Sequence, residues 1–196
     1  MVNSTVIFYD KNAYEFYNNT VNVDMSEHYR RFEEYLLPES SILDAGCGSG
    51  RDSLYFLSKG YKVSAFDASV EMVKLSSKLT GLTVQHAKFE DLNFNLVFNG
   101  IWASASLLHV DRGTIIDILK KLTAMLDKGG VLFMSFKYGD KVYKKDDRLF
   151  NCYDESSFSE MFSSIPELTI LELYRTADVR EERTNEFWLS AIVKKA

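Results

Sequence analysis

Cysteine and proline are scarce in this chain, with two residues of each among 196. Cys47 and Cys152 lie far apart, so the sequence predicts neither a disulfide framework nor a zinc cluster, and a reducing compartment is favoured. No apolar run approaches the roughly 20 residues of a membrane span. The first residues also lack the charged-then-apolar pattern of a secretion signal. We therefore expect a cytoplasmic protein with no membrane partner.

A strong charge of either sign is also missing. The net charge is −5, with 26% charged and 46% hydrophobic residues, which is the composition of an ordinary globular protein. This mildly acidic balance argues against a nucleic-acid partner. The length suits one hydrophobic core, so we expect a single domain over residues 1–196, as a monomer or a homodimer.

The most informative segment that is present is a glycine loop at residues 42–50, Ile-Leu-Asp-Ala-Gly-Cys-Gly-Ser-Gly. The apolar residues before it predict a strand, and residues 51–59 have helical spacing. A strand, a glycine loop and a helix form a ligand site at the carboxyl end of a strand in an open parallel sheet. Glycines let the backbone approach the ligand, and the N-terminus of the helix attracts an anionic group.

The spacing within this loop indicates the kind of ligand. In the dinucleotide pattern G-x-G-x-x-G the third glycine would fall at Arg51, so a nicotinamide-dependent oxidoreductase is a disfavoured alternative. No Gly-x-x-x-x-Gly-Lys-Ser/Thr motif is present either, which disfavours nucleotide triphosphate chemistry. Asp44 precedes the glycines and Arg51 follows them. This order suits a ligand that carries both an ammonium and a carboxylate, as an amino acid does.

A second acidic residue extends the expected site. Residues 61–67 predict a strand that ends at Asp67, and an acid about twenty residues after the loop can accept both hydroxyls of a ribose. Ala68, Ser69 and Met72 would then lie along the edge of an attached base. An amino acid, a ribose and a base together make S-adenosylmethionine, which we expect as the cofactor.

The two motifs together resemble those of the class I methyltransferases. The segment Asp44-Ala-Gly-Cys-Gly-Ser-Gly-Arg-Asp-Ser-Leu-Tyr, followed by Gly60-Tyr-x-Val-x-Ala-x-Asp67, looks like the small tellurite-resistance-type branch and its uncharacterised relatives. The resemblance implies a doubly wound, Rossmann-like α/β fold with seven mostly parallel strands, an antiparallel last strand, and helices on both faces. It also implies methyl transfer to a small-molecule acceptor by in-line displacement. Tellurite or another chalcogen oxyanion is an acceptor that the branch alone suggests.

The expected cofactor contacts follow from these motifs and from the resemblance. Asp44 and Arg51 are assigned to the methionine part and Asp67 to the ribose. Lys88 stands where the family often has an acid for the adenine amino group, and lysine cannot accept a hydrogen bond. We therefore expect Glu90, Asp91 or a backbone carbonyl to replace it, with the Phe89 N–H as a donor. The full expected set is Asp44, Ala45, Gly46, Cys47, Gly48, Gly50, Arg51, Asp67, Ala68, Ser69, Met72, Phe89, Glu90, Ser104 and Tyr17.

Residues 1–40 predict a helical cap in front of a Rossmann-like core at residues 41–196. We expect Asp10 to cap one helix and Ser26 to cap a second that runs through Leu37. In similar methyltransferases this segment closes over the cofactor, although such aromatic side chains also suit simple helix packing. Tyr17 is the preferred cation–π partner of the sulfonium. The candidate lid residues are Tyr9, Tyr14, Tyr17 and Thr20.

Strands and helices alternate over the rest of the chain. We expect strands at residues 82–87, 97–105, 131–136, 168–175 and 187–193, and helices at 70–80, 111–126 and 154–162. By analogy with the family, the last strand is placed antiparallel at the edge of the sheet. Residues 137–151 carry five cations and three acids, and we expect a substrate-side loop there. Residues 176–185 are expected to be a solvated connection.

The acceptor side offers fewer signals, because methyl transfer needs alignment rather than a fixed motif. His109, at the end of the fourth expected strand, is the candidate catalytic base, with a capping or core histidine as the alternative. Arg148 can hold an acidic acceptor through two hydrogen bonds. His28 and His86 fit no metal-ligand spacing, and no metal is expected. The candidate substrate contacts are Tyr14, Trp102, Arg148 and Tyr153.

Two other hypotheses keep the same cofactor. An RNA (tRNA) methyltransferase would use the basic residues of 137–148 and would bind RNA with a steep salt dependence. A binding protein of this fold without catalysis is the second hypothesis, because the sequence identifies no definite catalyst on the acceptor side.

Overall fold

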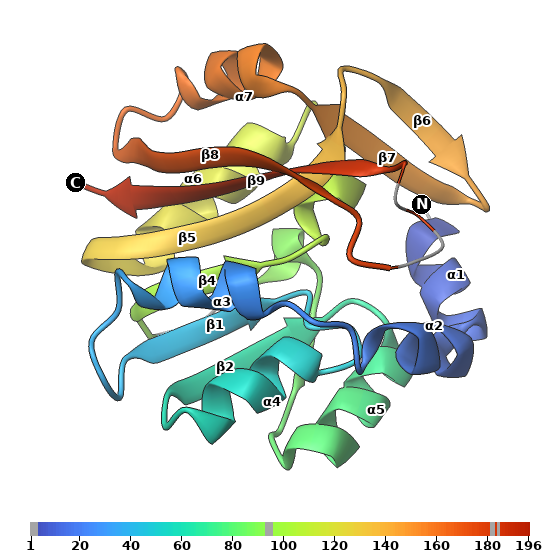
Figure 1. The fold of residues 1–196 in the computed structure, drawn as a ribbon. Coiled ribbons are helices and arrows are strands. Elements are labelled where there is room, and N and C mark those ends of the chain that lie inside the picture. Colours follow the sequence, from blue (N-terminus) through green and yellow to red (C-terminus); the bar gives the residue numbers. More distant parts are fainter. Residues whose placement is uncertain (1–3, 93–95, 181–182, 184) are drawn as a thin grey trace.

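The computed structural model describes residues 4–92, 96–180, 183 and 185–196. A twisted central sheet carries helices on both faces (Figure 1). The strands run in the order β3-β2-β1-β4-β5-β7-β6, and β9 pairs with both β5 and β8. The strands are β1 (Ser41–Ala45), β2 (Lys62–Asp67), β3 (Gln85–His86), β4 (Phe98–Ala103), β5 (Leu126–Tyr138), β6 (Val142–Lys145), β7 (Arg148–Tyr153), β8 (Leu168–Ala177) and β9 (Phe187–Lys195).

Seven of these strands form the predicted doubly wound sheet. The first five pair in parallel, and β9 runs antiparallel to β5 and β8. This order confirms the Rossmann-like α/β fold with its antiparallel last strand. The expected position of that strand was wrong, because β9 lies between β5 and β8 rather than at the edge. Its apolar run, Leu-Ser-Ala-Ile-Val, is buried, as suits a strand covered on both faces.

Helices cover the two faces with different parts of the core. On one face, α6 and α7 pack against side chains such as Leu132 and Met134; on the other, α3 and α4 pack against Phe133 and Ile42. The alternation along β5 reflects the two-residue period of a strand. The helices are α1 (Ser4–Lys11), α2 (Ala13–Thr20), α3 (Ser26–Glu33), α4 (Arg51–Ser58), α5 (Val70–Thr80), α6 (Ile115–Met125), α7 (Glu155–Phe162), and the 3₁₀ turns η1 (Phe89–Asp91) and η2 (Leu107–His109).

Several expected boundaries change. Asp10 lies inside α1, and α2 has no side-chain cap. Helix α3 ends at Glu33, because the chain tightens into turns that lead to Pro38. Helix α6 begins at Ile115, since Asp111 caps the preceding turn through the Gly113 N–H. By contrast, α5 has the expected bounds, and Asp154 caps α7 as expected, in a capping box with Ser157.

Residues 137–151 do not form the expected irregular loop. After the end of β5 they build the hairpin β6–β7, whose strands pair up to Lys145 and Arg148. The two residues between them, Asp146 and Asp147, have φ angles of 50° and 62°. Positive φ at both positions is the feature of a tight two-residue turn that matches strand twist. Asp-Asp is a rarer choice there than Asn-Gly, which explains why the sequence pattern did not indicate a hairpin.

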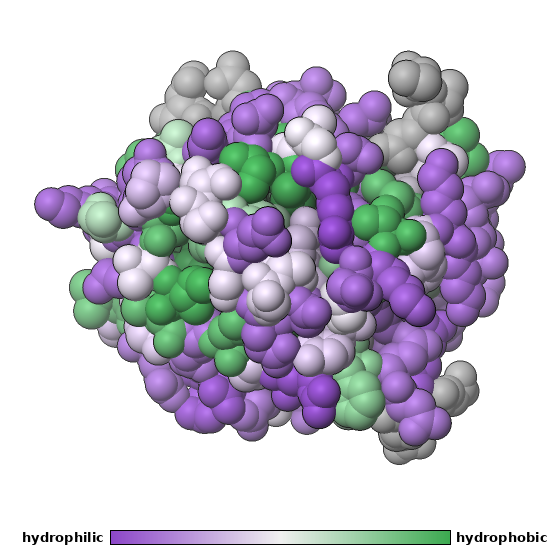
Figure 2. Space-filling view, turned by 90° about the horizontal axis from the view of Figure 1, so that it is seen from above, coloured by the Kyte–Doolittle hydropathy of each residue, from purple (hydrophilic) through white to green (hydrophobic). Residues whose placement is uncertain are grey.

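The molecular surface carries no large apolar face in the view of Figure 2, where hydrophilic side chains separate small groups of hydrophobic ones. Within the described part of the chain, no helix has the length and apolar character needed to cross a membrane.

Candidate active site

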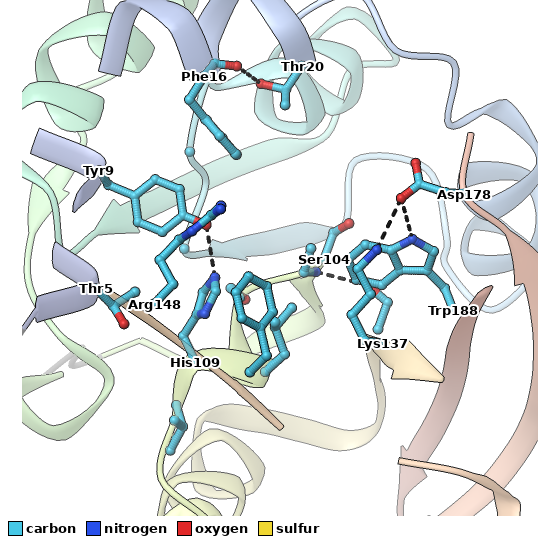
Figure 3. A pocket seen from close by; sticks show the side chains of 18 of the residues that line it. Thr5, Tyr9, Phe16, Thr20, Ser104, His109, Lys137, Arg148, Asp178 and Trp188 are labelled. Carbon is cyan, nitrogen blue, oxygen red and sulfur yellow. Dashed lines mark hydrogen bonds and ion pairs between the residues drawn. The ribbon is translucent and has the colours of Figure 1, made fainter. Parts of the chain in front are cut away.

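A cavity of about 700 Å³ lies at the carboxyl ends of the central strands. Its lining combines the glycine loop after β1, the end of β2, helix α1, the β6–β7 hairpin and the ends of β8 and β9. Figure 3 shows Tyr9, His109 and Arg148 on one side of it, and Lys137, Asp178 and Trp188 on the other. Segments that are far apart in the sequence therefore share one cavity.

The glycine loop is held in place from the end of β4. Gly46 has a φ of 78°, and a Cβ there would lie 2.6 Å from Cβ of Ser106. The Ser106 hydroxyl donates to the carbonyl of Ala45 at 2.7 Å, just before the loop. A side chain at position 46 would push these two segments apart. Glycine is thus required here for close packing as well as for the backbone angle.

Asp67 joins the glycine loop to the start of α5. Its Oδ2 accepts from the backbone N–H of Gly48 at 2.9 Å, and its Oδ1 accepts from that of Ser69 at 2.8 Å. Burial raises the pKa of Asp67, and the backbone N–H groups act in the opposite direction. A carboxylate offers about four acceptor positions, so each oxygen retains capacity toward the cavity that Asp67 lines. This arrangement fits the two hydroxyls of a ribose.

The charged pair expected for the methionine part is arranged differently. Asp44 is buried and does not line the cavity; its Oδ2 accepts from the Ser53 hydroxyl at 2.6 Å, and burial raises its pKa. Arg51 does line the cavity, and its Nε lies 2.7 Å from Oδ1 of Asp52. Asp52 also accepts from the indole N–H of Trp102 at 2.8 Å. The acid that lines the cavity beside Arg51 is therefore Asp52, not Asp44.

Asp52 was not among the expected residues, although its position in the first turn of α4 is one where acids are common. Burial by itself would raise its pKa. The charge of Arg51 and the hydrogen bonds from Arg51, Tyr29 and Trp102 outweigh this effect and lower the pKa of Asp52. Asp52 thus stays ionised and balances the guanidinium.

The remaining expected residues divide into two groups. Tyr14 is 71% exposed, Trp102 is fully buried against Phe133, and Tyr153 packs on Phe136, so none of these three lines the cavity. Ala45, Gly50 and Tyr17 are also outside its lining. The cavity does bring together Gly46, Cys47, Gly48, Arg51, Asp67, Ala68, Ser69, Met72, Phe89, Glu90, Ser104, His109 and Arg148.

His109 has both ring nitrogens engaged. Nδ1 lies 2.6 Å from the carbonyl of Leu149, which can only accept, so the proton is on Nδ1. Nε2 then accepts from the hydroxyl of Tyr9 at 2.9 Å. Burial lowers the pKa of His109 to about 4. The imidazole is neutral at neutral pH and bonded to the backbone, which agrees with the structural role that the sequence left open.

Helix α1 bridges the cavity. Asp10 accepts from the Ser69 hydroxyl at 2.6 Å on the α5 side. On the hairpin side, Ser4 donates to the carbonyl of Asp147 at 2.6 Å, and the N–H of Leu149 donates to the Thr5 hydroxyl at 3.1 Å. Tyr9 of this helix was among the expected lid residues, but Asp10 was expected only as a helix cap, because a single acid in a polar segment carries no signal of its own.

The opposite wall of the cavity is a charge-balanced cluster. Nζ of Lys137 lies 3.3 Å from Oδ2 of Asp178, also binds Glu186, and sits 4.3 Å from the centre of the Trp188 ring. Arg180 holds Asp178 through two bonds of 2.8 and 2.6 Å. Burial tends to raise the pKa of Asp178, but the hydrogen bonds from Arg180 and Trp188 keep it far below its usual range. The expected solvated connection at 176–185 was therefore wrong for Asp178, which is buried.

Comparisons with known proteins relate this chain to methyltransferases. A family model described as a methyltransferase domain matches residues 42–130. An uncharacterised methyltransferase of Staphylococcus carnosus is 28% identical over 151 residues, covering 72% of each chain.

Solved structures show the same fold. Burkholderia thailandensis 1,6-didemethyltoxoflavin-N1-methyltransferase, which holds 1,6-didemethyltoxoflavin and S-adenosylhomocysteine, is 21% identical with a TM-score of 0.78, over 97% of this chain and 88% of its own. The N-methyltransferase NodS of Bradyrhizobium japonicum, with bound S-adenosylhomocysteine, is 15% identical with a TM-score of 0.72, over 99% of both chains. These matches show a methyltransferase domain at residues 42–130, and the activity they support is that of an S-adenosylmethionine-dependent methyltransferase.

Proposed function

We propose that this methyltransferase modifies a small-molecule acceptor. The observation that carries the proposal is that one cavity extends from Asp67 and the glycine loop, which we assign as the cofactor half, to a second half below α1 and the hairpin. Its volume of about 700 Å³ lies within the range of small-molecule sites. Helix α1 bridges this space, which suits a small acceptor better than a polynucleotide.

The cofactor half would hold S-adenosylmethionine, which supplies an activated methyl group when bound. Asp67 would accept the ribose hydroxyls, and the loop at Gly46 and Gly48 would admit the methionine part without side-chain obstruction. Ala68, Ser69 and Met72 would border the base on one side. Phe89, packed edge-on against Phe66 at 5.2 Å, would border it on the other, next to Glu90.

Arg148 is the strongest candidate for direct acceptor recognition in the second half. Its guanidinium lies 4.0 Å from the ring centre of Phe8, and its Nε is buried without a hydrogen-bond partner among the described residues. Such an unpaired donor favours a polar or anionic group on the acceptor. The Burkholderia relative, which holds a small heterocyclic compound, supports a small acceptor as well. The tellurite-resistance-type branch remains a narrower proposal that rests on motif similarity.

Calorimetric titration with S-adenosylmethionine, S-adenosylhomocysteine and NAD tests the cofactor half. We expect binding of the two sulfur compounds and none of NAD. Asp67→Ala should weaken the binding of S-adenosylhomocysteine by about 100-fold, because two hydrogen bonds to a charged group are lost. Unchanged affinity in a variant that still melts cooperatively would refute the ribose assignment.

A panel of acceptors tests the second half, with S-adenosylhomocysteine release as the readout. It should contain 1,6-didemethyltoxoflavin, tellurite and unmodified tRNA. Turnover with a small molecule and none with tRNA supports the proposal. Turnover with tRNA alone would favour the RNA hypothesis, and cofactor binding without any turnover would favour a binding protein.

A further inference from the structure

The floor of the acceptor half lies where the side chains on one face of the sheet change from large to small along the strands. Trp102, Phe133 and Ile192 are paired neighbours on β4, β5 and β9 and fill one row with large side chains. Two residues further along β5 and β9, the paired neighbours are Ser135 and Ser190. Side chains two apart lie on the same face of a strand, so the space above these serines is left open.

The serine row continues on both sides. Tyr174 of β8 pairs with Ser190, and Ser104 follows one residue after the last pair of β4 with β5, Ala103 with Met134. Ser104, Ser135 and Ser190 all line the cavity. Oγ of Ser190 is buried and makes no hydrogen bond within the described part of the chain. An unpaired buried hydroxyl at the floor of a cavity indicates a ligand with a polar group.

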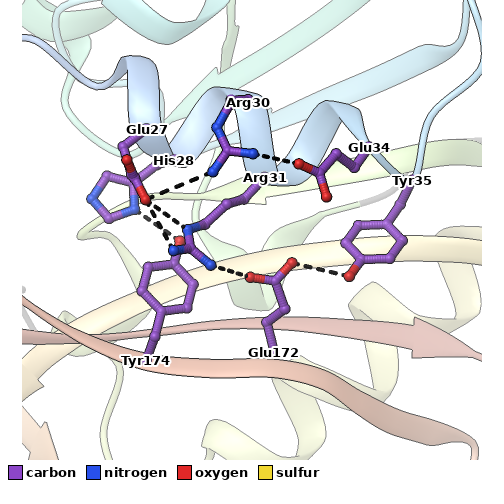
Figure 4. A network of polar contacts seen from close by, with 8 residues as sticks. All are labelled: Glu27, His28, Arg30, Arg31, Glu34, Tyr35, Glu172 and Tyr174. Atoms are coloured by element: carbon purple, nitrogen blue, oxygen red, sulfur yellow. Dashed lines mark hydrogen bonds and ion pairs between the residues drawn. The ribbon is translucent and has the colours of Figure 1, made fainter.

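His28 reaches this floor from α3. It is 6% exposed and lines the cavity, with its ring centre 5.7 Å from that of Phe133. Its Nδ1 lies 2.9 Å from the hydroxyl of Tyr174. The guanidinium of Arg31 lies 4.4 Å above the Tyr174 ring and binds Glu172 at 2.8 Å (Figure 4). This network holds the imidazole on the side away from the cavity, and Nε2 is the ring nitrogen that has no hydrogen-bond partner among the described residues.

The two cavity histidines therefore differ in what they can do. In His109 both nitrogens are used, by Leu149 and Tyr9. In His28, Nδ1 is hydrogen-bonded to Tyr174, whereas Nε2 has no hydrogen-bond partner among the described residues. Burial lowers the pKa of His28; Glu27 and Asp52 act to raise it, and Arg31 and Arg51 to lower it further. A neutral imidazole at neutral pH can accept a proton.

We propose that Nε2 of His28 accepts the proton of the acceptor, which is a small compound with a nucleophilic N–H or O–H group bound over Ser104, Ser135 and Ser190. The inference rests on the proposed function. The lone pair of the acceptor atom forms the new bond to the methyl carbon, the electrons of the carbon–sulfur bond stay on sulfur, and the acceptor proton moves to Nε2. Nδ1–H donates meanwhile to the Tyr174 oxygen, which makes Tyr174 a positioning residue.

Nitrogen-detected NMR of the three histidines in the protein saturated with S-adenosylhomocysteine tests this assignment without turnover. The inference requires His28 to be neutral, with the proton on Nδ1 and a lone pair on Nε2. Pyrazole serves as the N–H probe and 1-methylpyrazole as its matched control. We expect pyrazole to shift the Nε2 resonance of His28 and to bind at least about tenfold more tightly than the control, since one hydrogen bond separates them.

The variant His28→Asn sharpens the test, because its amide N–H can still donate to Tyr174 while the second nitrogen is gone. It should bind S-adenosylhomocysteine as the unaltered protein does and lose the preference for pyrazole. A proton on Nε2, or equal response of His28 to both probes, would overturn the inference. Failure of S-adenosylhomocysteine to bind would instead refute the proposed function, and the tautomer of His28 is measured in either case.

Discussion

The Tyr9 hydroxyl and Nε2 of His109 lie 2.9 Å apart, although one hundred positions separate the two residues in the chain. This bond connects α1 to η2, the turn that follows β4, beside the cavity that would receive both cofactor and acceptor. Since Tyr9 is largely buried here, its pKa is raised, and it stays a hydrogen-bond donor at neutral pH. The pair therefore closes the site rather than presenting a free base to it.

His109 should make stability depend on pH. Its pKa is about 4 in the folded protein and 6.5 as a reference, so below pH 6.5 the unfolded chain takes up a proton that the folded protein does not. Stability is therefore lost as the pH falls from 6.5 to 4, by about 3 kcal/mol for this group. Urea unfolding at pH 7, 5 and 4 should show a smaller loss for His109→Asn than for the unaltered protein. An equal loss of unfolding free energy with falling pH in both proteins would contradict the lowered pKa of His109.

Asp10 should control the opening of α1. Asp10→Ala removes the acceptor for the Ser69 hydroxyl and for the N–H of Glu71. We expect faster amide hydrogen exchange in residues 4–11 and a faster release of S-adenosylhomocysteine, by about 3- to 10-fold, as lost hydrogen bonds of this kind contribute about 1 kcal/mol. Glu71→Ala, which keeps the backbone N–H, is the matched control. Equal amide exchange rates in the two variants would show that the hydrogen bonds of Asp10 do not hold α1 in place.

Gly46 and Ser106 should be energetically coupled. Gly46→Ala places a Cβ 2.6 Å from Cβ of Ser106 and forces alanine to a φ of 78°. The unfavourable φ alone costs about 1–2 kcal/mol. Ser106→Gly in the same chain should recover the part due to the contact and leave the part due to φ. A double-mutant cycle by chemical denaturation measures this coupling, expected at about 1 kcal/mol or more; strict additivity would show that the loop relaxes around the new methyl group.

The two sides of the Lys137 cluster should respond unequally. Asp178→Asn leaves Lys137 and Arg180 without their shared buried carboxylate, and we expect a loss of about 3 kcal/mol. Lys137→Met retains the aliphatic stem beside Trp188 and leaves Asp178 with Arg180, so a loss of about 1 kcal/mol is expected. Urea denaturation at neutral pH compares them. A larger loss for Lys137→Met would mean that Glu186, rather than Asp178, is the partner that matters.

The motifs that carry the proposed cofactor half could be recognised in the sequence because their signals are local. The glycines, Asp67 and Met72 lie within one continuous segment that runs from β1 through α4 and β2 into α5, and a ligand that spanned this segment would impose its spacing on the sequence. Where the local rule failed, a side-chain partner decided the outcome. The Ser53 hydroxyl donates to the carboxylate of Asp44 inside the fold, and the acid that pairs with Arg51 is its chain neighbour Asp52.

The sequence by itself determined the fold class and the cofactor chemistry, since alternating apolar runs and glycine positions reflect backbone constraints that act over short distances. Only the tertiary structure decided which residues meet around the rest of the cavity. Tyr9 meets His109, His28 meets Tyr174, and Lys137 meets Asp178 across separations of 100, 146 and 41 residues. Such pairs depend on strand register, on the turn at Asp146 and on how α1 and α3 dock, and these features arise from packing of the whole chain rather than from any local pattern.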